Sequence, residues 1–144
     1  MLIGEHKHSI DPKKRLSIPA RFRKEIGDRA VLTRGLDGCL FLFPLKEWGE
    51  LADKLGKLPI GQQDTRAFVR LILAGASEVE TDQLGRILVP DFLRDYAGLK
   101  KSVIIAGLFN RLEIWDDEKW TAYKTNLEKN SDRIAEKLGE LGVI

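Results

Sequence analysis

Short apolar segments separated by polar turns recur along the chain and predict small strands. Leu16 and Ile18 alternate with Arg15 and Ser17, which is the period-two pattern of a strand with one buried face. Continuous apolar runs predict four more deeply buried strands, at 30–33, 39–43, 103–106 and 112–115. Hairpin turns are expected within each pair of these strands, at 35–38 and at 107–110.

Apolar residues with helical spacing predict helices around these strands. Pro19 and Pro90 are each expected at the first helical position of a short helix, and Gly27 and Gly98 are expected to end these helices. Two longer amphipathic helices are predicted from apolar stripes: Trp48, Leu51, Ala52 and Leu55, and then Trp120, Tyr123 and Leu127. Helices and strands together indicate an α+β fold.

Two further helices are predicted outside this pattern. The first is expected to have Asp64 or Thr65 as its N-cap and to end at Gly75. The second is expected to have Ser131 as its N-cap. Its apolar residues should face inward, and they are Ile134, Ala135, Leu138 and Leu141.

One pattern occurs twice in the chain. Asp-x-x-x-Arg, followed by two mostly apolar positions, a β-branched residue and proline, begins at Asp11 and recurs 71 residues later at Asp82. Arg23 and Gly27 match Arg94 and Gly98 at the same offset. After one inserted residue an offset of 72 aligns a further set: Val31 with Val103, Gly35 with Gly107, Leu36 with Leu108, Leu40 with Leu112 and Trp48 with Trp120. Such regular matching indicates an internal duplication.

The duplication divides the chain into similar units. We expect a first copy at 5–55, a linker with a helix at 56–76, a second copy at 77–127 and a C-terminal helix at 128–144. A copy of about fifty residues is near the lower limit for an independent core. Pairing the strands of both copies into one barrel would supply a larger core, as a homodimer would.

Composition and charge narrow the class of protein. The 144 residues, 43% hydrophobic and 32% charged, are typical of a globular chain. Cys39 is the only cysteine, so no intramolecular disulfide can form, which favours a reducing compartment and a cytoplasmic protein. Residues 1–5 do not resemble a signal peptide, and no apolar run is long enough to span a membrane.

The charge is unevenly distributed. The net charge is +2, yet residues 1–34 contain nine Lys and Arg residues against four acidic ones. A basic N-terminal arm on a near-neutral body favours a polyanionic partner. A solvated charged surface without a partner is the alternative.

The two Asp-x-x-x-Arg segments are expected to form tight turns between strands. Asp11 can accept hydrogen bonds from nearby backbone N–H groups and hold its turn closed. Gly85 suits a positive φ in the second turn, whereas the first turn has Lys14 there, at a backbone cost. Each arginine offers a planar set of donors that fits a phosphate or a guanine edge.

The doubled Asp-x-x-x-Arg motif, with its proline, hairpin and Trp-bearing helix, resembles the MraZ family over roughly residues 1–127. The resemblance implies two tandem AbrB-like swapped-hairpin β-barrel repeats paired within one chain. It also implies a homo-oligomeric ring of about eight or more subunits that binds double-stranded DNA at repeated boxes upstream of its own division and cell-wall operon. The expected role is a transcriptional repressor located on the nucleoid.

The motif residues are the candidate site. Arg15, Lys13, Lys14 and Arg86 are the predicted DNA-binding residues, and Asp11 and Asp82 are expected to brace the turns. Arg86 lies in a less basic arm and can either contact DNA or serve the turn structure. In the alternative interpretation, both Asp–Arg pairs are ion pairs that only maintain hairpin geometry.

Other chemistry finds little support in the sequence. His6 and His8 have no obvious third metal ligand, and Cys39 has no base beside it. Without a catalytic constellation we expect a protein that is not an enzyme and needs no metal or cofactor. The main alternative function is a protein-interaction module of the antitoxin type, and a purely structural ring is a third.

Overall fold

The computed structural model describes residues 1–144 and combines strands and helices in two similar halves. The first copy contains β1 (Leu2–Ser9), β2 (Arg15–Ser17), α1 (Arg23–Ile26), β3 (Arg29–Arg34), β4 (Leu40–Pro44) and α2 (Leu45–Gly56). The second contains β5 (Ser77–Glu80), β6 (Arg86–Leu88), α4 (Asp91–Ala97), β7 (Ser102–Phe109), β8 (Leu112–Asp116) and α5 (Asp117–Lys129). Between the copies lies α3 (Gln63–Val69), and α6 (Ser131–Glu140) ends the chain.

The two copies exchange their first strands. β1 of the first copy pairs with β7 of the second, and β5 of the second pairs with β3 of the first. The six-stranded sheet has the order β1-β7-β8-β4-β3-β5, and β2 pairs with β6 in a separate two-stranded ribbon. Every pairing is antiparallel, and neither copy has a complete sheet by itself. The predicted α+β fold of two copies paired within one chain is confirmed.

One core cluster of 19 residues joins the copies. Leu16 of β2 and Ile87 of β6 face each other across the ribbon and are both buried. Phe22 and Ile26 of the short helical segment after β2 are buried, as are Leu93 and Ala97 of α4. Burial of both copies in one cluster gives the small repeats the core that each lacks alone.

A second apolar cluster lies on the other face of the sheet and supports the long helices. Its buried members are Cys39, Phe41, Phe43, Ile104 and Trp115. Trp48 of α2 packs against Phe43, and Trp120 of α5 packs against Trp115, with ring centroids 5.8 and 5.3 Å apart.

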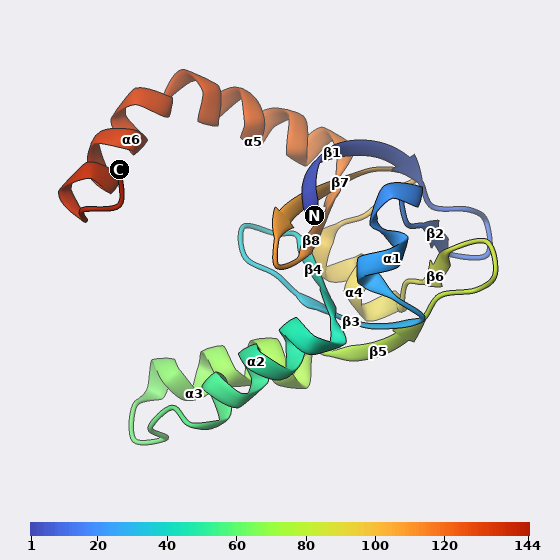
Figure 1. Cartoon of the computed structure of the whole chain (residues 1–144), viewed down its shortest axis with the longest axis horizontal. Helices are drawn as coiled ribbons and strands as arrows, with labels where there is room; N and C mark the ends of the chain where they lie inside the picture. Colours follow the sequence, from blue (N-terminus) through green and yellow to red (C-terminus); the bar gives the residue numbers. More distant parts are fainter.

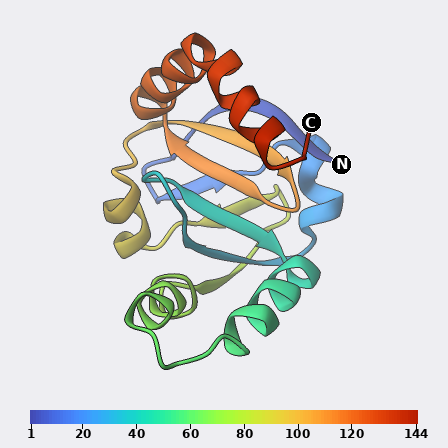
Figure 2. The ribbon, with the colours of Figure 1, turned by 90° about the vertical axis from the view of Figure 1, so that its left-hand side faces the viewer.

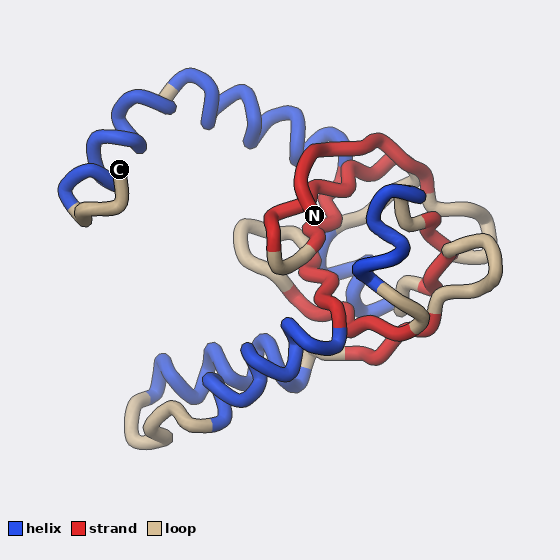
Figure 3. Tube along the Cα trace, viewed as in Figure 1, coloured by secondary structure: helices blue, strands red, loops and turns tan.

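The long helices project away from the ribbon. In Figure 1, α2 and α3 lie side by side on one side of the strands, and α5 and α6 curve outward from the other. The loops that connect β1 to β2 and β5 to β6 lie at the opposite end of the molecule (Figure 1, Figure 3). A view turned by 90° shows the two helical arms apart again (Figure 2). None of these helices has the length and apolar character needed to cross a membrane.

The expected inward face of α6 is wrong. Ile134 and Ala135 are half-buried, but Leu138 is exposed and Leu141 is 75% exposed. The reason is geometric: α6 bends away from α5 near Asn130 and extends beyond the sheet, so no core of this chain faces it (Figure 1).

Several predicted helix starts differ from the structure. α3 begins one residue before Asp64, with Gln62 as N-cap and no side-chain cap. Ser131 is the first residue of α6, and its hydroxyl donates to the Glu128 carbonyl instead of capping the helix. Pro19 and Pro90 are extended N-caps, one position before the first helical residue: Pro19 precedes a 3-10 turn (Ala20–Phe22) that leads into α1, and Pro90 precedes α4. The predicted stops at Gly27 and Gly98 are confirmed.

The alignment of Val31 with Val103 is also wrong. Val31 pairs with Phe43, and the corresponding pair in the second copy is Ile104 with Trp115. Val103 instead belongs to the main core. Ile10 and Thr81 occupy equivalent positions in the two copies. Thr81 donates its N–H to the Asp28 carbonyl, and Ile10 donates its N–H to the Lys101 carbonyl. Lys101 is therefore the structural counterpart of Asp28. The connector between α4 and β7 is therefore longer by two residues than the connector between α1 and β3.

Candidate nucleic-acid interface

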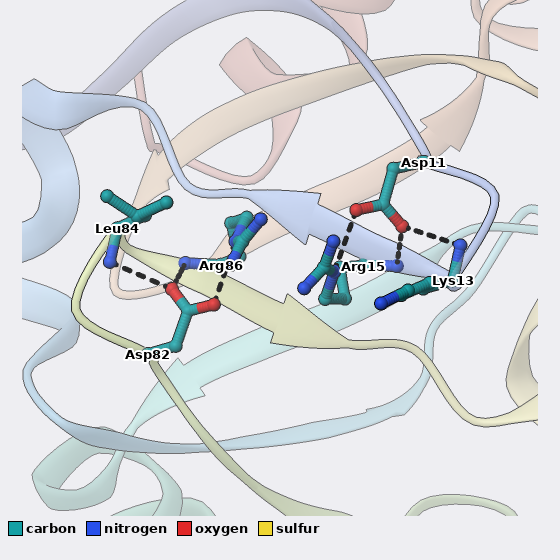
Figure 4. Close-up of polar contacts among 6 residues, drawn as sticks. All are labelled: Asp11, Lys13, Arg15, Asp82, Leu84 and Arg86. Carbon is teal, nitrogen blue, oxygen red and sulfur yellow. Dashed lines mark hydrogen bonds and ion pairs between the residues drawn. The ribbon is translucent and has the colours of Figure 1, made fainter.

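The β2–β6 ribbon presents one face to solvent with a turn at each end. Leu16 pairs with Ile87 on the buried face. The outward positions are Arg15, Ser17, Arg86 and Leu88, with Arg15 opposite Leu88 and Ser17 opposite Arg86. Figure 4 shows both arginines near the middle of the ribbon and both aspartates at its ends.

The first turn is held by the Asp11 carboxylate. Its Oδ1 accepts hydrogen bonds from the backbone N–H groups of Lys13 and Arg15, both at 2.9 Å. Its Oδ2 accepts from Arg15 Nε at 2.7 Å (Figure 4). One side chain thus closes the turn and fixes the direction of the arginine.

The second turn repeats this geometry. Asp82 Oδ1 accepts from the N–H groups of Leu84 and Arg86, both at 2.9 Å, and Oδ2 accepts from Arg86 Nε at 2.7 Å. The matching distances mean that the motif specifies one local structure twice.

The turns are also joined to each other through their backbones. Ile18 donates its N–H to the Gly85 carbonyl at 2.8 Å, and Val89 donates to the Lys14 carbonyl at 3.0 Å. Gly85 has φ +75° and Lys14 has φ +66°, so both turns have a positive φ at this position, which is less favourable for lysine than for glycine. Each turn therefore needs the ribbon partner from the other copy.

The turn geometry lowers the pKa of both carboxyl groups. For Asp11 the largest cause is the backbone hydrogen bond from Arg15, with further lowering from the Arg15 side chain and its charge. For Asp82 the largest cause is the backbone hydrogen bond from Arg86, followed by the Arg86 side chain. Donors aimed at a carboxylate favour its charged form, so both aspartates stay ionised at neutral pH.

Each motif arginine uses only part of its donor set within the protein. Arg15 and Arg86 donate Nε to their aspartates, while their terminal Nη groups donate to no protein acceptor. The side chains are 32% and 26% exposed. The ion pair and an outward donor pair are therefore compatible in the same side chain, so the ion pair by itself does not exclude a DNA contact.

The two turns differ in charge. Lys13 and Lys14 are exposed in the first turn and form no ion pair. Their counterparts are Leu84, which is 61% exposed, and Gly85. The first turn is therefore the more basic one.

Sequence reasoning missed two outward positions of the ribbon, Ser17 and Leu88. They occupy equivalent places in the two copies, and Leu88 is 59% exposed. Their alternation with the buried Leu16 and Ile87 was the available signal. A serine hydroxyl can bond a base edge, and an apolar side chain can contact a thymine methyl group.

Two further arginines, Arg23 and Arg94, connect the short helices to the residues that directly follow β2 and β6. Arg23 donates Nε to the Ile18 carbonyl at 2.9 Å, and Arg94 donates Nε to Val89 at 3.2 Å. Their shared offset in the sequence pointed to this common structural role.

The residues weighed for other chemistry lie away from the turns. Cys39 is buried, its thiol donates to the Leu36 carbonyl, and burial raises its pKa, which opposes nucleophilic use. His6 packs edge-on against Phe22 at 5.2 Å, and its Nε2 is buried without a hydrogen-bond partner. Desolvation is the main cause that lowers the pKa of His8.

Comparisons with known proteins agree with the duplicated structure. The family model described as "MraZ protein, putative antitoxin-like" matches twice, at residues 1–71 and 72–139. A protein named "Transcriptional regulator MraZ" from Caldicellulosiruptor bescii is 50% identical over 99% of this chain and 100% of its own length. A protein of the same name from Pelotomaculum thermopropionicum is 52% identical over 99% of both chains, and one from Alkaliphilus metalliredigens is 50% identical over 99% of this chain and all of its own.

Proposed function

The chain belongs to the MraZ family, and on that premise we propose that this transcriptional regulator is a sequence-specific DNA-binding repressor that reads DNA through its β2–β6 ribbon. The observation that carries the proposal is the pair of arginines on one outward face, each aimed by an aspartate and each with free Nη donors. A two-stranded β-ribbon fits into the major groove of B-form DNA, where an arginine can bond O6 and N7 of guanine.

The residues around the ribbon support a division of roles. Asp11 and Asp82 accept hydrogen bonds within their turns and are assigned a structural role. A direct contact of either carboxylate with DNA is disfavoured, because the phosphates would repel it. Arg15 is proposed to reach a base edge, and Lys13 and Lys14 are proposed to contact phosphates beside it. We propose the same kind of base contact for Arg86, which has fewer neighbouring cations to contact phosphates beside it.

Self-association would strengthen such contacts. The exposed apolar residues of the C-terminal segment, Leu138, Leu141, Val143 and Ile144, favour a second copy of the chain as their partner. We propose a homo-oligomeric ring that presents several ribbons to repeated boxes upstream of the protein's own operon, on the nucleoid. Each ribbon would then bind at a raised effective concentration.

The same exposed apolar residues support a second candidate function. An apolar C-terminal surface could hold a different protein, as an antitoxin-type interaction module would. The two functions differ in what the ribbon does, because an interaction module of this kind has no need of free arginine donors on the opposite end of the molecule.

Fluorescence-anisotropy titration tests the proposal. The wild-type protein is titrated into the duplex from upstream of its own gene and into a scrambled duplex of the same composition, at two salt concentrations. We expect a clear preference for the native duplex and an affinity that falls steeply as salt rises. Equal and weak binding to both duplexes would contradict sequence-specific regulation and favour the interaction module.

A further inference from the structure

A basic pocket lies beside the first turn, outside the motif itself. It has a volume of about 520 Å3 and is lined by Ser9, Ile10, Asp11, Pro12, Lys14, Arg94, Leu99, Lys100 and Lys101. Four of these residues are cations and one is an acid. The pocket is therefore strongly positive for its size.

Both copies contribute to the pocket. Ile10 donates its N–H to the Lys101 carbonyl at 2.8 Å, which joins the first turn to the connector between α4 and β7. Arg94 is positioned from α4 by its bond to the Val89 carbonyl and also pairs with the exposed Asp91. The pocket is thus held together by contacts to the backbone, and its three lysines are exposed.

Half of the cations in this pocket are unpaired, since Arg94 pairs with Asp91 and Lys100 pairs with Glu118. The carboxylate of Asp11 is occupied by its turn. Lys14 and Lys101 form no ion pair, and Lys100 approaches only the exposed Glu118, at 3.8 Å. Ammonium groups around a concave surface suit a phosphate group, which they bind as point charges.

The corresponding position beside the second turn has a different charge. Asp28 stands where the pocket has Lys101, and the shorter connector has no counterpart of Leu99 and Lys100. Arg29 next to it is paired with Glu78 and Glu80, at 3.7 and 3.9 Å. Lys100 and Lys101, which line the pocket beside the first turn, therefore have no basic counterpart beside the second turn.

We propose that this pocket binds a phosphate group, namely a backbone phosphodiester of the DNA that lies on the β2–β6 ribbon. The inference rests on the proposed function. Lys14 belongs both to the pocket and to the first turn, so a strand contacted by Lys13 and Arg15 would continue past Lys100 and Lys101. The pocket would then add sequence-independent affinity at the first-turn end of each ribbon and fix its orientation.

The test removes the two connector charges and leaves the turn intact. Lys100→Gln with Lys101→Gln is compared with Lys129→Gln with Lys137→Gln, which removes the same charge from the α5–α6 arm at the other end of the molecule. Both variants are first compared with the wild type for thermal stability and for mass by light scattering. Affinity for the native and scrambled duplexes is then measured over a series of salt concentrations.

A lost phosphate contact has a distinct signature. We expect the connector variant to bind both duplexes more weakly by the same factor, with the native-to-scrambled ratio unchanged. The slope of log affinity against log salt should decrease by about 0.9 for each lost phosphate contact. The arm variant should keep the wild-type slope. An unchanged slope in the connector variant would overturn the proposal.

A titration with ATP distinguishes the two possible sources of the phosphate group, the DNA backbone and a free phosphorylated ligand. ATP is titrated into the wild type and the connector variant by calorimetry at fixed ionic strength. No saturable ATP binding is expected. Saturable binding lost in the variant, with the DNA salt slope unchanged, would overturn the assignment to DNA in favour of a free phosphorylated ligand.

The same measurements test the proposed function independently of the pocket. If the wild type binds native and scrambled duplexes equally, sequence-specific regulation fails. The pocket is still tested in that case, because a backbone contact changes the salt slope on either duplex. If the wild type binds neither duplex, the pocket's assignment to DNA is overturned as well.

Discussion

The two turns of the ribbon have the same geometry and different charge. In both turns one aspartate accepts two backbone N–H groups at 2.9 Å and one arginine Nε at 2.7 Å. Around this shared frame the first turn has Lys13 and Lys14, and the second has Leu84 and Gly85. The motif therefore specifies how an arginine is aimed, while its neighbours give the two ends of the ribbon different charge.

The difference extends to the connectors that flank the turns. Lys100 and Lys101 lie beside the first turn, whereas Asp28 and the paired Arg29 lie beside the second. A duplicated chain can thus keep one fold while the two ends of its ribbon acquire different charge. An asymmetric ribbon would have a preferred orientation on DNA.

The largest expected effect comes from removing the arginines one at a time. Arg15→Ala should lower affinity for the native duplex by roughly ten- to a hundredfold, since a bidentate base contact contributes about 1–3 kcal/mol. Arg86→Ala should have a smaller effect because fewer cations support it. Both are measured by anisotropy, with Arg133→Ala on α6 as the control.

The arginine variants also separate the two interpretations of the motif. Because the Asp11–Arg15 pair is partly exposed, its loss should change the melting temperature little. Unfolding of Arg15→Ala would mean that the pair serves the hairpin alone. Equal losses of affinity in Arg15→Ala and Arg86→Ala would remove the proposed difference between the turns.

Acid should weaken both turns together. A carboxyl group with a lowered folded pKa stabilises the fold above its unfolded value, about 3.9, and this contribution is lost as pH falls through the folded pKa. We expect the free energy of unfolding to fall below about pH 4 in the wild type. In the variant Asp11→Asn with Asp82→Asn this dependence should be flatter, as measured by urea unfolding between pH 2 and pH 6. A dependence as steep as in the wild type would contradict the proposed brace.

Exchanging the residues at the positive-φ positions tests the backbone difference. Gly85→Lys should destabilise the fold by about 1–2 kcal/mol, because a side chain is strained at this φ. A Cβ at this position would also lie 2.2 Å from Arg23 Nε, so Arg23 must move. Lys14→Gly should change stability less and weaken DNA binding. Thermal unfolding of both variants checks this order, and a larger loss in Lys14→Gly would contradict it.

The smallest effects are expected at the outward positions between the arginines. Ser17→Ala should lower affinity for the native duplex by about 1 kcal/mol, roughly fivefold, if its hydroxyl bonds a base edge. Leu88→Ser makes the second copy resemble the first and should alter base preference more than affinity. Selection from a randomised duplex library measures both, and identical preferred sequences for Leu88→Ser and the wild type would exclude a base contact by Leu88.

The sequence predicted the local features of this structure better than the distant ones. The turns, the strained backbone at Lys14 and the buried pairs of α1 and α4 follow from residue type and spacing, which act over a few positions. The predicted equivalence of Val31 and Val103 failed for a different reason. Two residues are added before β7 and one is lost in the next hairpin, so the sequence offset on either side of β7 differs by only one residue. A shift of one residue along a strand moves a side chain to the other face of the sheet, and the sequence matching did not reveal it.

The C-terminal helix illustrates a second limit. The apolar stripe of α6 shows that the helix needs a partner, but an amphipathic pattern does not show whether that partner lies in the same chain. The exchange of β1 and β5 between copies was likewise implied by the family resemblance and not by the pattern of any strand. The basic pocket depended on that exchange, because its walls come from both copies.

Site-specific photo-cross-linking tests the central claim most directly. A benzophenone side chain is placed at Leu88 on the ribbon, which is 59% exposed, or at Leu138 on α6 as the matched apolar control. Each variant is bound to the native duplex and irradiated. We expect an efficient cross-link to DNA from position 88 and none from position 138. A cross-link from position 138 without one from position 88 would show that DNA lies on the helical arms, and the ribbon would not be the DNA-reading surface.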